Sequence, residues 1–354
     1  MRTILKQLLV LLFFCSLIYV IVAAVMLALQ PPSTGHILDT GKAGNGFTSE
    51  PQKIVLDRDP LKTTKPKIIF IGASNTVRGF RPEQFVSYFP GYEIHNMAVS
   101  ASNLSQTKRI IELAYEVMPK EAQGKSIFVL GLAYMLLMDN KVLWHSQLMD
   151  IENEELRFGL YQQKDGSIKP QVPQKYFSYY VKFLQPFFYL NNVTSSFGAK
   201  IKYYFEVISR VLLKSKNPAF TPTNDERPVV DEVYKKWALN KWHENMGTED
   251  DTVSEDQFMV LLDIAKLVSE HGGKLIIVDL PLPAWHQESS KHFKDYQFKK
   301  KKILSMASSL GNVYYINMQD LNNNVDYIDS AHPSPKATYK WSRWLSQKMS
   351  GIVF

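Results

Sequence analysis

Short apolar runs alternate with longer amphipathic segments along most of this 354-residue chain, and this alternation constrains the fold more than any other feature. A short apolar run between turn residues is typical of a strand that is buried on both faces. The five expected strands cover residues 68–71, 92–97, 127–131, 274–279 and 313–318. The expected helices cover residues 82–88, 104–117, 255–270, 289–310 and 334–349. Strands that alternate with helices predict an α/β fold, a parallel sheet with helices on both faces.

The alternation is lost between residues 141 and 252, so the α/β domain is expected in two parts, residues 66–140 and 253–354. The intervening segment is basic and aromatic-rich, with helical stretches and loops, and it predicts a helical insertion. It could pack on the main domain, form a cap that shapes an acceptor groove, or rest on a membrane. The aromatic residues that characterise it are Tyr176, Phe177, Tyr179, Tyr180, Phe187, Phe188, Tyr203 and Tyr204.

The chain begins with a long apolar segment, since residues 8–29 carry no charge. About 20 helical residues span a bilayer core, so residues 1–30 predict a transmembrane signal anchor. Arg2 and Lys6 precede the run, which predicts a cytoplasmic N-terminus and an exported remainder. A cleaved secretory signal is the alternative, although the run ends in a poor cleavage site. Residues 31–65, rich in Pro, Gly, Ser and Thr, are expected to form a tether.

Composition argues against a disordered protein, a disulfide-rich protein and a metalloprotein. Hydrophobic residues make up 45% of the chain and charged residues 21%, which is typical of a globular protein. Cys15, the only cysteine, lies in the apolar segment, so the rest of the chain offers neither a disulfide nor a thiolate ligand. The histidines show no metal-ligand spacing, and no metal or cofactor is expected. The net charge of +7 is spread out; its densest run, residues 299–302, predicts a solvated helix face or a basic surface for an anionic lipid or polymer.

Ser74 follows the first expected strand, in the sequence Gly72-Ala73-Ser74. The glycine allows a tight turn and would place the serine at the carboxyl edge of the sheet, where open α/β folds bind ligands. A serine that caps the next helix would account for the same residues. The motif is therefore a candidate nucleophile with a structural alternative.

A second motif, Asp329-Ser330-Ala331-His332, lies between the last expected strand and the last expected helix. A histidine can take the proton of a serine hydroxyl if its ring is oriented and its charged form is stabilised. A carboxylate three residues earlier on the same loop can do both. The alternative is an aspartate that caps a turn beside an exposed histidine.

Together the two motifs resemble the SGNH (GDSL-like) hydrolase superfamily, which has a Gly-Asp-Ser block after its first strand and an Asp-x-x-His block before its last helix. The resemblance covers residues 67–349 apart from the insertion. It implies a three-layer, flavodoxin-like sheet of about five strands. It also implies that Ser74 is the nucleophile, His332 the general base and Asp329 the group that orients the base.

Three positions depart from the family pattern. Ala73 stands where the first block of the family has its aspartate. Ala101 stands where the family has a glycine whose N–H contributes to the oxyanion hole, and Ala133 stands where the family has an asparagine whose amide donates to the oxyanion. The backbone N–H of Ala101 could still serve. The side chains of Ser102, Asn103 and Asn75 are candidates to replace the missing donor.

Three further residues lie near the expected site. Arg78 and Arg81 follow the nucleophile turn and could hold an anionic acceptor or form surface salt bridges. Asp279 ends the fourth expected strand at the same sheet edge, where capping of a turn is its expected role.

A signal anchor joined to such a domain resembles the envelope acyl-transfer proteins of the superfamily, which act in O-acetylation of cell-wall or exported polysaccharides and in D-alanylation of teichoic acid. The expected function is an O-acyltransferase or esterase that uses an acyl-serine intermediate. The expected partners are an envelope glycan or other acylated polymer, the lipid bilayer and a multipass membrane O-acyltransferase, without nucleic acid. The alternative, left open by Ala133, is a non-catalytic protein that binds acylated polymer or organises a membrane acyltransferase.

Overall fold

The structure is a computed structural model, and it describes residues 2–29, 61–100, 102–138, 161–164, 167–170, 230–248 and 250–354. Its centre is a five-stranded parallel sheet with the strand order β2-β1-β3-β6-β7. This order is that of a flavodoxin-like doubly wound sheet, and it confirms the predicted α/β class. The strands are β1 (Lys67–Gly72), β2 (Glu93–Asn96), β3 (Ser126–Leu132), β6 (Lys274–Asp279) and β7 (Val313–Asn317).

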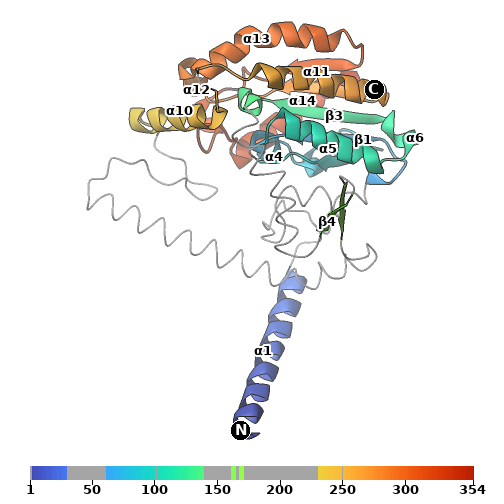
Figure 1. The fold of residues 1–354 in the computed structure, drawn as a ribbon, viewed down its shortest axis with the longest axis vertical. Coiled ribbons are helices and arrows are strands. Elements are labelled where there is room, and N and C mark those ends of the chain that lie inside the picture. Colours follow the sequence, from blue (N-terminus) through green and yellow to red (C-terminus); the bar gives the residue numbers. More distant parts are fainter. Residues whose placement is uncertain are drawn as a thin grey trace.

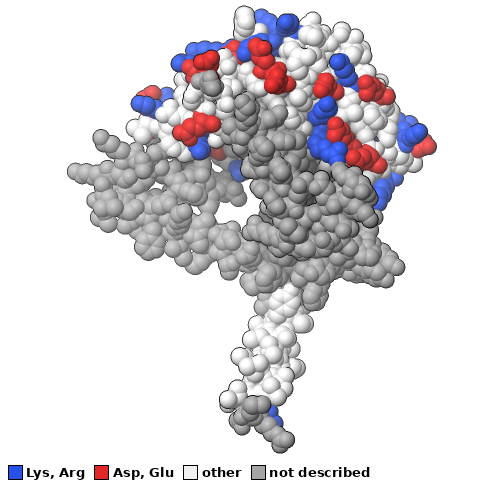
Figure 2. Space-filling view, in the orientation of Figure 1, with Lys and Arg blue, Asp and Glu red and all other residues white. Residues whose placement is uncertain are grey.

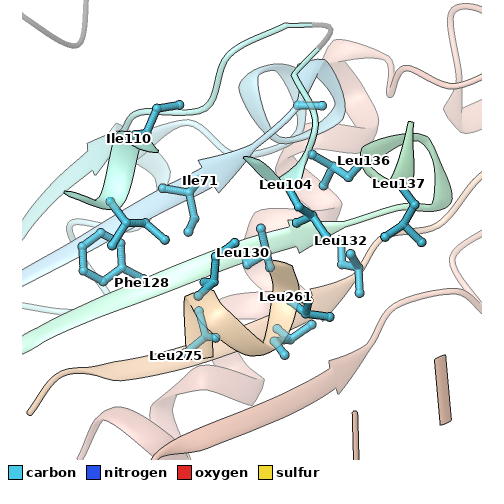
Figure 3. Close-up of a cluster of buried hydrophobic side chains, with 14 of the residues drawn as sticks. Ile71, Leu104, Ile110, Phe128, Leu130, Leu132, Leu136, Leu137, Leu261 and Leu275 are labelled. Atoms are coloured by element: carbon cyan, nitrogen blue, oxygen red, sulfur yellow. The ribbon is translucent and has the colours of Figure 1, made fainter. Parts of the chain in front are cut away.

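Successive strand residues point to opposite faces of the sheet and enter two separate apolar clusters. Ile69 and Ile71 of β1 lie in the first cluster, whereas Ile68 and Phe70 lie in the second. The first cluster, part of which is drawn in Figure 3, is covered by α5 (Leu104–Val117), α11 (Glu255–Glu270) and α13 (Lys291–Ser308). The second cluster is covered by α14 (Pro335–Val353), which also contacts the short helix α4 (Ser74–Gly79). Figure 1 shows these helices on the two sides of the sheet, as the three-layer prediction requires.

One expected helix is not observed, and a short helix forms that was not expected. In place of a helix over residues 82–88 the chain forms a 3-10 turn, η1 (Pro82–Gln84), and then a second turn in which the N–H groups of Tyr88 and Phe89 donate to the carbonyl of Phe85. The helix expected over residues 289–310 is observed as α13, and a short helix that was not expected, α12 (Ala284–Ser289), precedes it. Ser290 separates them, since it leaves the helical conformation and its Oγ accepts a hydrogen bond from the N–H of Phe293.

The segment expected as a helical insertion contains both structure types in its described parts. Helix α10 (Glu232–Met246) begins at the capping side chain of Asp231 and ends at Gly247. The strands β4 (Tyr161–Lys164) and β5 (Ser167–Pro170), however, form an antiparallel pair that the helical prediction did not include. The sequence signal for it was Asp165-Gly166, a dipeptide typical of hairpins. The aromatic residues that characterise the segment lie outside the described residues.

Helix α1 (Arg2–Leu29) contains a window, Ile4–Ile21, that has a mean hydropathy of 2.4 and none of whose residues is buried. Its length and composition suffice to cross a membrane, and they equally fit a signal sequence. Figure 2 shows this helix as a largely uncharged rod with a basic side chain near its N-terminal end, in contrast to the intermingled acidic and basic side chains of the α/β domain. Most of the expected tether lies outside the described residues, but Leu61, within it, is fully buried in the first cluster.

Candidate active site

Ser74 is positioned by a tight turn at the carboxyl end of β1. Gly72 has a φ of +135°, which L side chains rarely adopt, and a Cβ there would lie 2.6 Å from Oγ1 of Thr76. A Cβ on Gly131, at the end of β3, would also collide with Oγ1 of Thr76. These two glycines therefore let α4 begin directly against the sheet edge, with Ser74 as its first residue.

The loop that carries Asp329 and His332 is closed by its own backbone. The N–H of Ile328 donates to the carbonyl of His332 over 2.9 Å. Oδ1 of Asp329 accepts hydrogen bonds of 2.8 Å from the N–H groups of Ala331 and His332. Because α14 begins at the cap Ser334, two residues after His332, the loop is fixed at that end as well. The aspartate therefore shapes the loop in addition to contacting the imidazole.

The three residues of the expected triad form one hydrogen-bonded chain. Oγ of Ser74 lies 2.7 Å from Nε2 of His332, and Nδ1 of His332 lies 2.7 Å from Oδ2 of Asp329. An ionised carboxylate only accepts, so Nδ1 donates to it and Nε2 is left to accept the serine proton. The side chains of His332 and Asp329 are 18% and 14% exposed, and Ser74 is also partly exposed. The three hydrogen-bonded residues are therefore mostly shielded from water, while Ser74 stays accessible.

The environment of Asp329 keeps it ionised. Burial raises the pKa of its carboxyl group, but the hydrogen bond and charge of His332, with the N–H groups of His332 and Ala331, outweigh that effect. The pKa of Asp329 therefore lies below its ordinary value. A carboxylate held in this form can orient His332 and stabilise its protonated ring throughout the neutral pH range.

The four candidate oxyanion donors have different surroundings. Ala101 lies outside the described residues. Oγ of Ser102 donates to the carbonyl of Gly72 over 3.1 Å, and Nδ2 of Asn75 donates to the carbonyl of Ala331 over 2.9 Å. Both side chains are buried and hold the turn and the loop that carry the triad. Asn103 caps α5, where its side chain accepts from the N–H of Gln106.

The two candidate substrate-binding arginines lie on the outer side of the nucleophile turn. Arg78 is exposed near the end of α4, and Arg81 is partly exposed just before η1. Within the described part of the chain, neither guanidinium forms a hydrogen bond or an ion pair, so the alternative of surface salt bridges has no support among those residues.

Ala133, at the position of the family asparagine, is buried in the second cluster together with Phe80 and Trp341. Its carbonyl accepts from the N–H of Leu136 at the start of η2 (Tyr134–Leu137). The methyl group thus contributes to apolar packing and offers no donor.

A second histidine, which the sequence analysis did not single out, supports the triad loop. His286 of α12 is fully buried; its Nδ1 lies 2.6 Å from the carbonyl oxygen of Ser330, and its Nε2 lies 2.8 Å from the hydroxyl of Tyr134. Burial lowers the pKa of His286 to about 4, against the opposing effects of the Ser330 carbonyl and Asp329. The neutral ring therefore donates to the loop and accepts from Tyr134 at physiological pH.

Helix α10 packs on the same loop. Nε1 of Trp242 donates to Oγ of Ser330 over 3.1 Å. Tyr234 is buried near Ser330 and Asp329, and burial together with the charge of Asp329 raises its pKa to about 12. These contacts join elements far apart in the sequence, and no local motif could have predicted them.

Asp279 has a different role from the turn cap expected for it. Its fully buried carboxylate accepts a 2.6 Å bond from Nζ of Lys300 and bonds of 2.7 to 2.8 Å from Tyr296, Tyr315 and Gln319. Lys300, part of the basic run expected on a solvated face, is therefore buried in an ion pair. This network fixes α13 and β7 to the end of β6.

Three potential metal ligands that are separated in the sequence are brought together by the fold. One ligand atom from each of His243, Asp251 and His292 lies within 4.8 Å of the others. No metal site was expected from the sequence, because the spacing of these residues along the chain matches no metal motif.

No family model matches the chain, and no curated protein is significantly similar to it. One similar solved structure is a provisionally assigned acylhydrolase from Bacteroides fragilis, with a TM-score of 0.38, 12% identity, and coverage of 86% of this chain and 97% of that chain. Another, from Streptococcus pneumonia, is provisionally described as platelet activating factor, with a TM-score of 0.41, 11% identity, and coverage of 86% and 93%. At such low identities and scores, neither likeness bears on the chemistry of the site.

Proposed function

We propose that this chain is a serine-dependent acyl-transfer enzyme of the SGNH type, an esterase or O-acyltransferase. The observation that carries the proposal is the hydrogen-bonded chain from Ser74 through His332 to Asp329, with 2.7 Å at each link. A serine, a histidine and a partly buried carboxylate in this order are the components of nucleophilic acyl transfer. The turn at Gly72 supports the proposal because it presents the serine at the sheet edge where ligands bind.

In the proposed reaction Oγ of Ser74 attacks the carbonyl carbon of an ester while Nε2 of His332 takes the hydroxyl proton. The tetrahedral intermediate collapses, the bond to the leaving oxygen breaks, and His332 returns its proton to that oxygen. The acyl group is then esterified to Ser74. Water or a sugar hydroxyl attacks this acyl-serine, gives its proton to His332, and Ser74 recovers its proton as the acylated product leaves.

The oxyanion would be stabilised by backbone N–H groups. In α4 the N–H groups of Thr76 and Val77 bond to the carbonyl of Ala73, so the N–H of Ser74 lies outside the helical ladder. We propose that it acts together with the N–H of Ala101. Because Ser102 and Asn75 already donate to backbone carbonyls, their side chains are assigned to holding the site.

The proposed setting is the cell envelope. Helix α1 would anchor the chain with its N-terminus in the cytoplasm and export the catalytic domain, since Arg2 and Lys6 precede the apolar span. The acyl acceptor or donor would be an envelope glycan or another acylated polymer, and a multipass membrane O-acyltransferase would be a partner. Arg78 and Arg81, which pair with no other described residue, would hold an anionic group of that polymer.

The test uses the full-length chain in detergent and a fluorophosphonate probe, which reacts covalently with activated serines. Labelling should occur at Ser74, disappear in Ser74→Ala, and slow strongly in His332→Ala. Ser309→Ala, which removes an exposed hydroxyl near the end of α13, is the matched control and should label normally.

Labelling of intact protein at another residue would refute the assignment of Ser74. A correctly folded chain that neither labels nor cleaves p-nitrophenyl acetate would favour the non-catalytic alternative. Normal envelope acylation in cells that carry only Ser74→Ala would have the same meaning.

A further inference from the structure

His243, Asp251 and His292 come from three parts of the chain and meet beside the α10–α13 contact. His243 lies in the last turn of α10, Asp251 in the loop that follows, and His292 in the first turn of α13. One ligand atom from each lies within 4.8 Å of the other two. Two imidazole nitrogens and a carboxylate oxygen are a ligand set that binds divalent transition metals.

The spacing of two of these atoms fits coordination better than a hydrogen bond. Nδ1 of His243 and Oδ1 of Asp251 are 3.4 Å apart. A hydrogen bond between such atoms is typically about 2.9 Å long. Two ligand atoms on a tetrahedral zinc ion, with bonds of about 2.0–2.1 Å, are about 3.3 Å apart. The other oxygen of Asp251 is occupied by Nζ of the exposed Lys291, at 2.5 Å, which leaves Oδ1 directed to His243.

His292 supplies an independent indication. It is only 4% exposed, and its Nε2 is buried without a hydrogen-bond partner. The centroid of its ring lies 5.3 Å from that of His243 and 6.3 Å from that of Tyr134. Folded proteins rarely leave a buried ring nitrogen unpaired, and coordination to a metal ion would satisfy it.

We propose that His243, Asp251 and His292 bind one divalent transition-metal ion of the zinc type, with water completing a tetrahedron. The mixture of nitrogen and oxygen ligands favours zinc over calcium or magnesium, which prefer sites built of oxygen atoms. The ion would fasten the end of α10 to the start of α13. Because Trp242, beside His243, donates to Ser330, the ion would also steady the loop that carries Asp329.

The experiment uses the untagged full-length chain in detergent, stripped of metal by a chelator and titrated with Zn²⁺. We expect one equivalent of Zn²⁺ to bind and to raise the thermal midpoint of unfolding. His243→Asn and Asp251→Asn should each weaken binding more than about tenfold, since even the loss of a residue that only supports a ligand costs about 10–100-fold. Both side chains are partly exposed, so these variants should fold. His292→Gln should also lose the site.

Two control variants should keep the site. Lys291→Gln removes the neighbouring cation of Asp251 without removing a ligand, and it should bind Zn²⁺ at least as tightly as the wild type. Ser74→Ala should bind normally, so the result is independent of the proposed enzymatic function. X-ray absorption at the zinc edge should show nitrogen and oxygen ligands only. Failure to bind one equivalent, binding within tenfold of the wild type in His243→Asn or Asp251→Asn, loss of binding in either control, or sulfur coordination from Cys15 would each overturn the proposal.

Discussion

Replacement of Asp329 by asparagine tests the roles assigned to the two carboxylate oxygens. Oδ1 accepts from two backbone N–H groups and Oδ2 accepts from Nδ1 of His332. In Asp329→Asn the amide oxygen must replace Oδ1, because an NH₂ group there would face two N–H donors. The NH₂ group then faces Nδ1, so Nδ1 must accept and the proton must move to Nε2. The histidine would present a donor to Ser74 and could not take its proton.

The size of the effect follows from this change of tautomer. In serine proteases the same substitution leaves the geometry intact and lowers turnover about 10⁴-fold, which corresponds to about 5.5 kcal/mol in the activation free energy. The backbone bonds of the Asp329 loop should survive in the asparagine variant, so its folding should change little. We therefore expect fluorophosphonate labelling of Ser74 to slow by about 10²–10⁴-fold at an almost unchanged thermal midpoint.

Asp326→Asn is the matched control, because Asp326 lies three residues earlier and pairs with Lys340 instead of His332. The assay is the labelling rate at pH 7.5, with thermal unfolding of each variant measured in parallel. A labelling rate for Asp329→Asn within tenfold of the wild type would refute the tautomer argument. Equal slowing by Asp326→Asn would show that any loss of negative charge near the loop has the same effect.

The other predictions concern stability and location. Asn75→Ala should destabilise the domain by about 1–3 kcal/mol, since it leaves the buried carbonyl of Ala331 without its donor; chemical denaturation would measure this. Lys300→Met should lower the free energy of unfolding by about 3–5 kcal/mol, because it leaves the carboxylate of Asp279 buried without its cation. A decrease below about 1 kcal/mol would contradict the assigned ion pair. His286→Asn should flatten the pH dependence of stability between about pH 4 and 6.5. A reporter that works only outside the cytoplasm should be active when fused after Phe354, and an inactive, stably expressed fusion would contradict export.

The elements of the sheet could be predicted closely because their apolar patterns are local. The expected strand at residues 274–279 and the expected helices at 104–117 and 255–270 have the observed bounds. The short helix α12 was missed, because six residues are too few to show a helical apolar period. The hairpin of β4 and β5 was missed although Asp165-Gly166 indicated it, because the aromatic and basic composition of the whole segment masked this short local signal.

The candidate site was accessible from the sequence only where its residues lie close together in the chain. Asp329 and His332 are three residues apart, and Ser74 follows a recognisable strand and turn. The contacts that support the loop join residues 152, 88 and 44 positions apart: Tyr134 with His286, Trp242 with Ser330, and His286 with Ser330. Such pairs follow from the packing of α10, α12 and η2 on the loop, and packing partners are not encoded in any one segment.

The pH dependence of folding tests the buried neutral state of His286. The pKa of His286 is about 4 in the folded chain, because the ring is buried, against an ordinary value of 6.5. Between these pH values the unfolded chain binds the proton and the folded chain does not. The stabilisation of the folded chain by neutral His286 is therefore complete above pH 6.5 and is lost as the pH falls to about 4. The difference between the two pKa values corresponds to about 3 kcal/mol in the free energy of unfolding.

Asp329, whose pKa is lowered from 3.8, loses its contribution to the stability of the fold only below that pH. Its effect is therefore separate from that of His286. Burial also lowers the pKa of His292, so both histidines contribute to the pH dependence of wild-type stability. The contribution of His286 is the difference between the wild type and His286→Asn. Tyr134→Phe removes the hydrogen bond to His286 without removing the titrating ring. It should therefore lower the thermal midpoint at every pH and leave the slope of that midpoint against pH unchanged. The measurement is the thermal midpoint of the detergent-solubilised chain from pH 7.5 to 4.5. If His286→Asn loses as much stability as the wild type over that range, another group is responsible, and the buried neutral state of His286 that supports the Ser330 carbonyl must be abandoned.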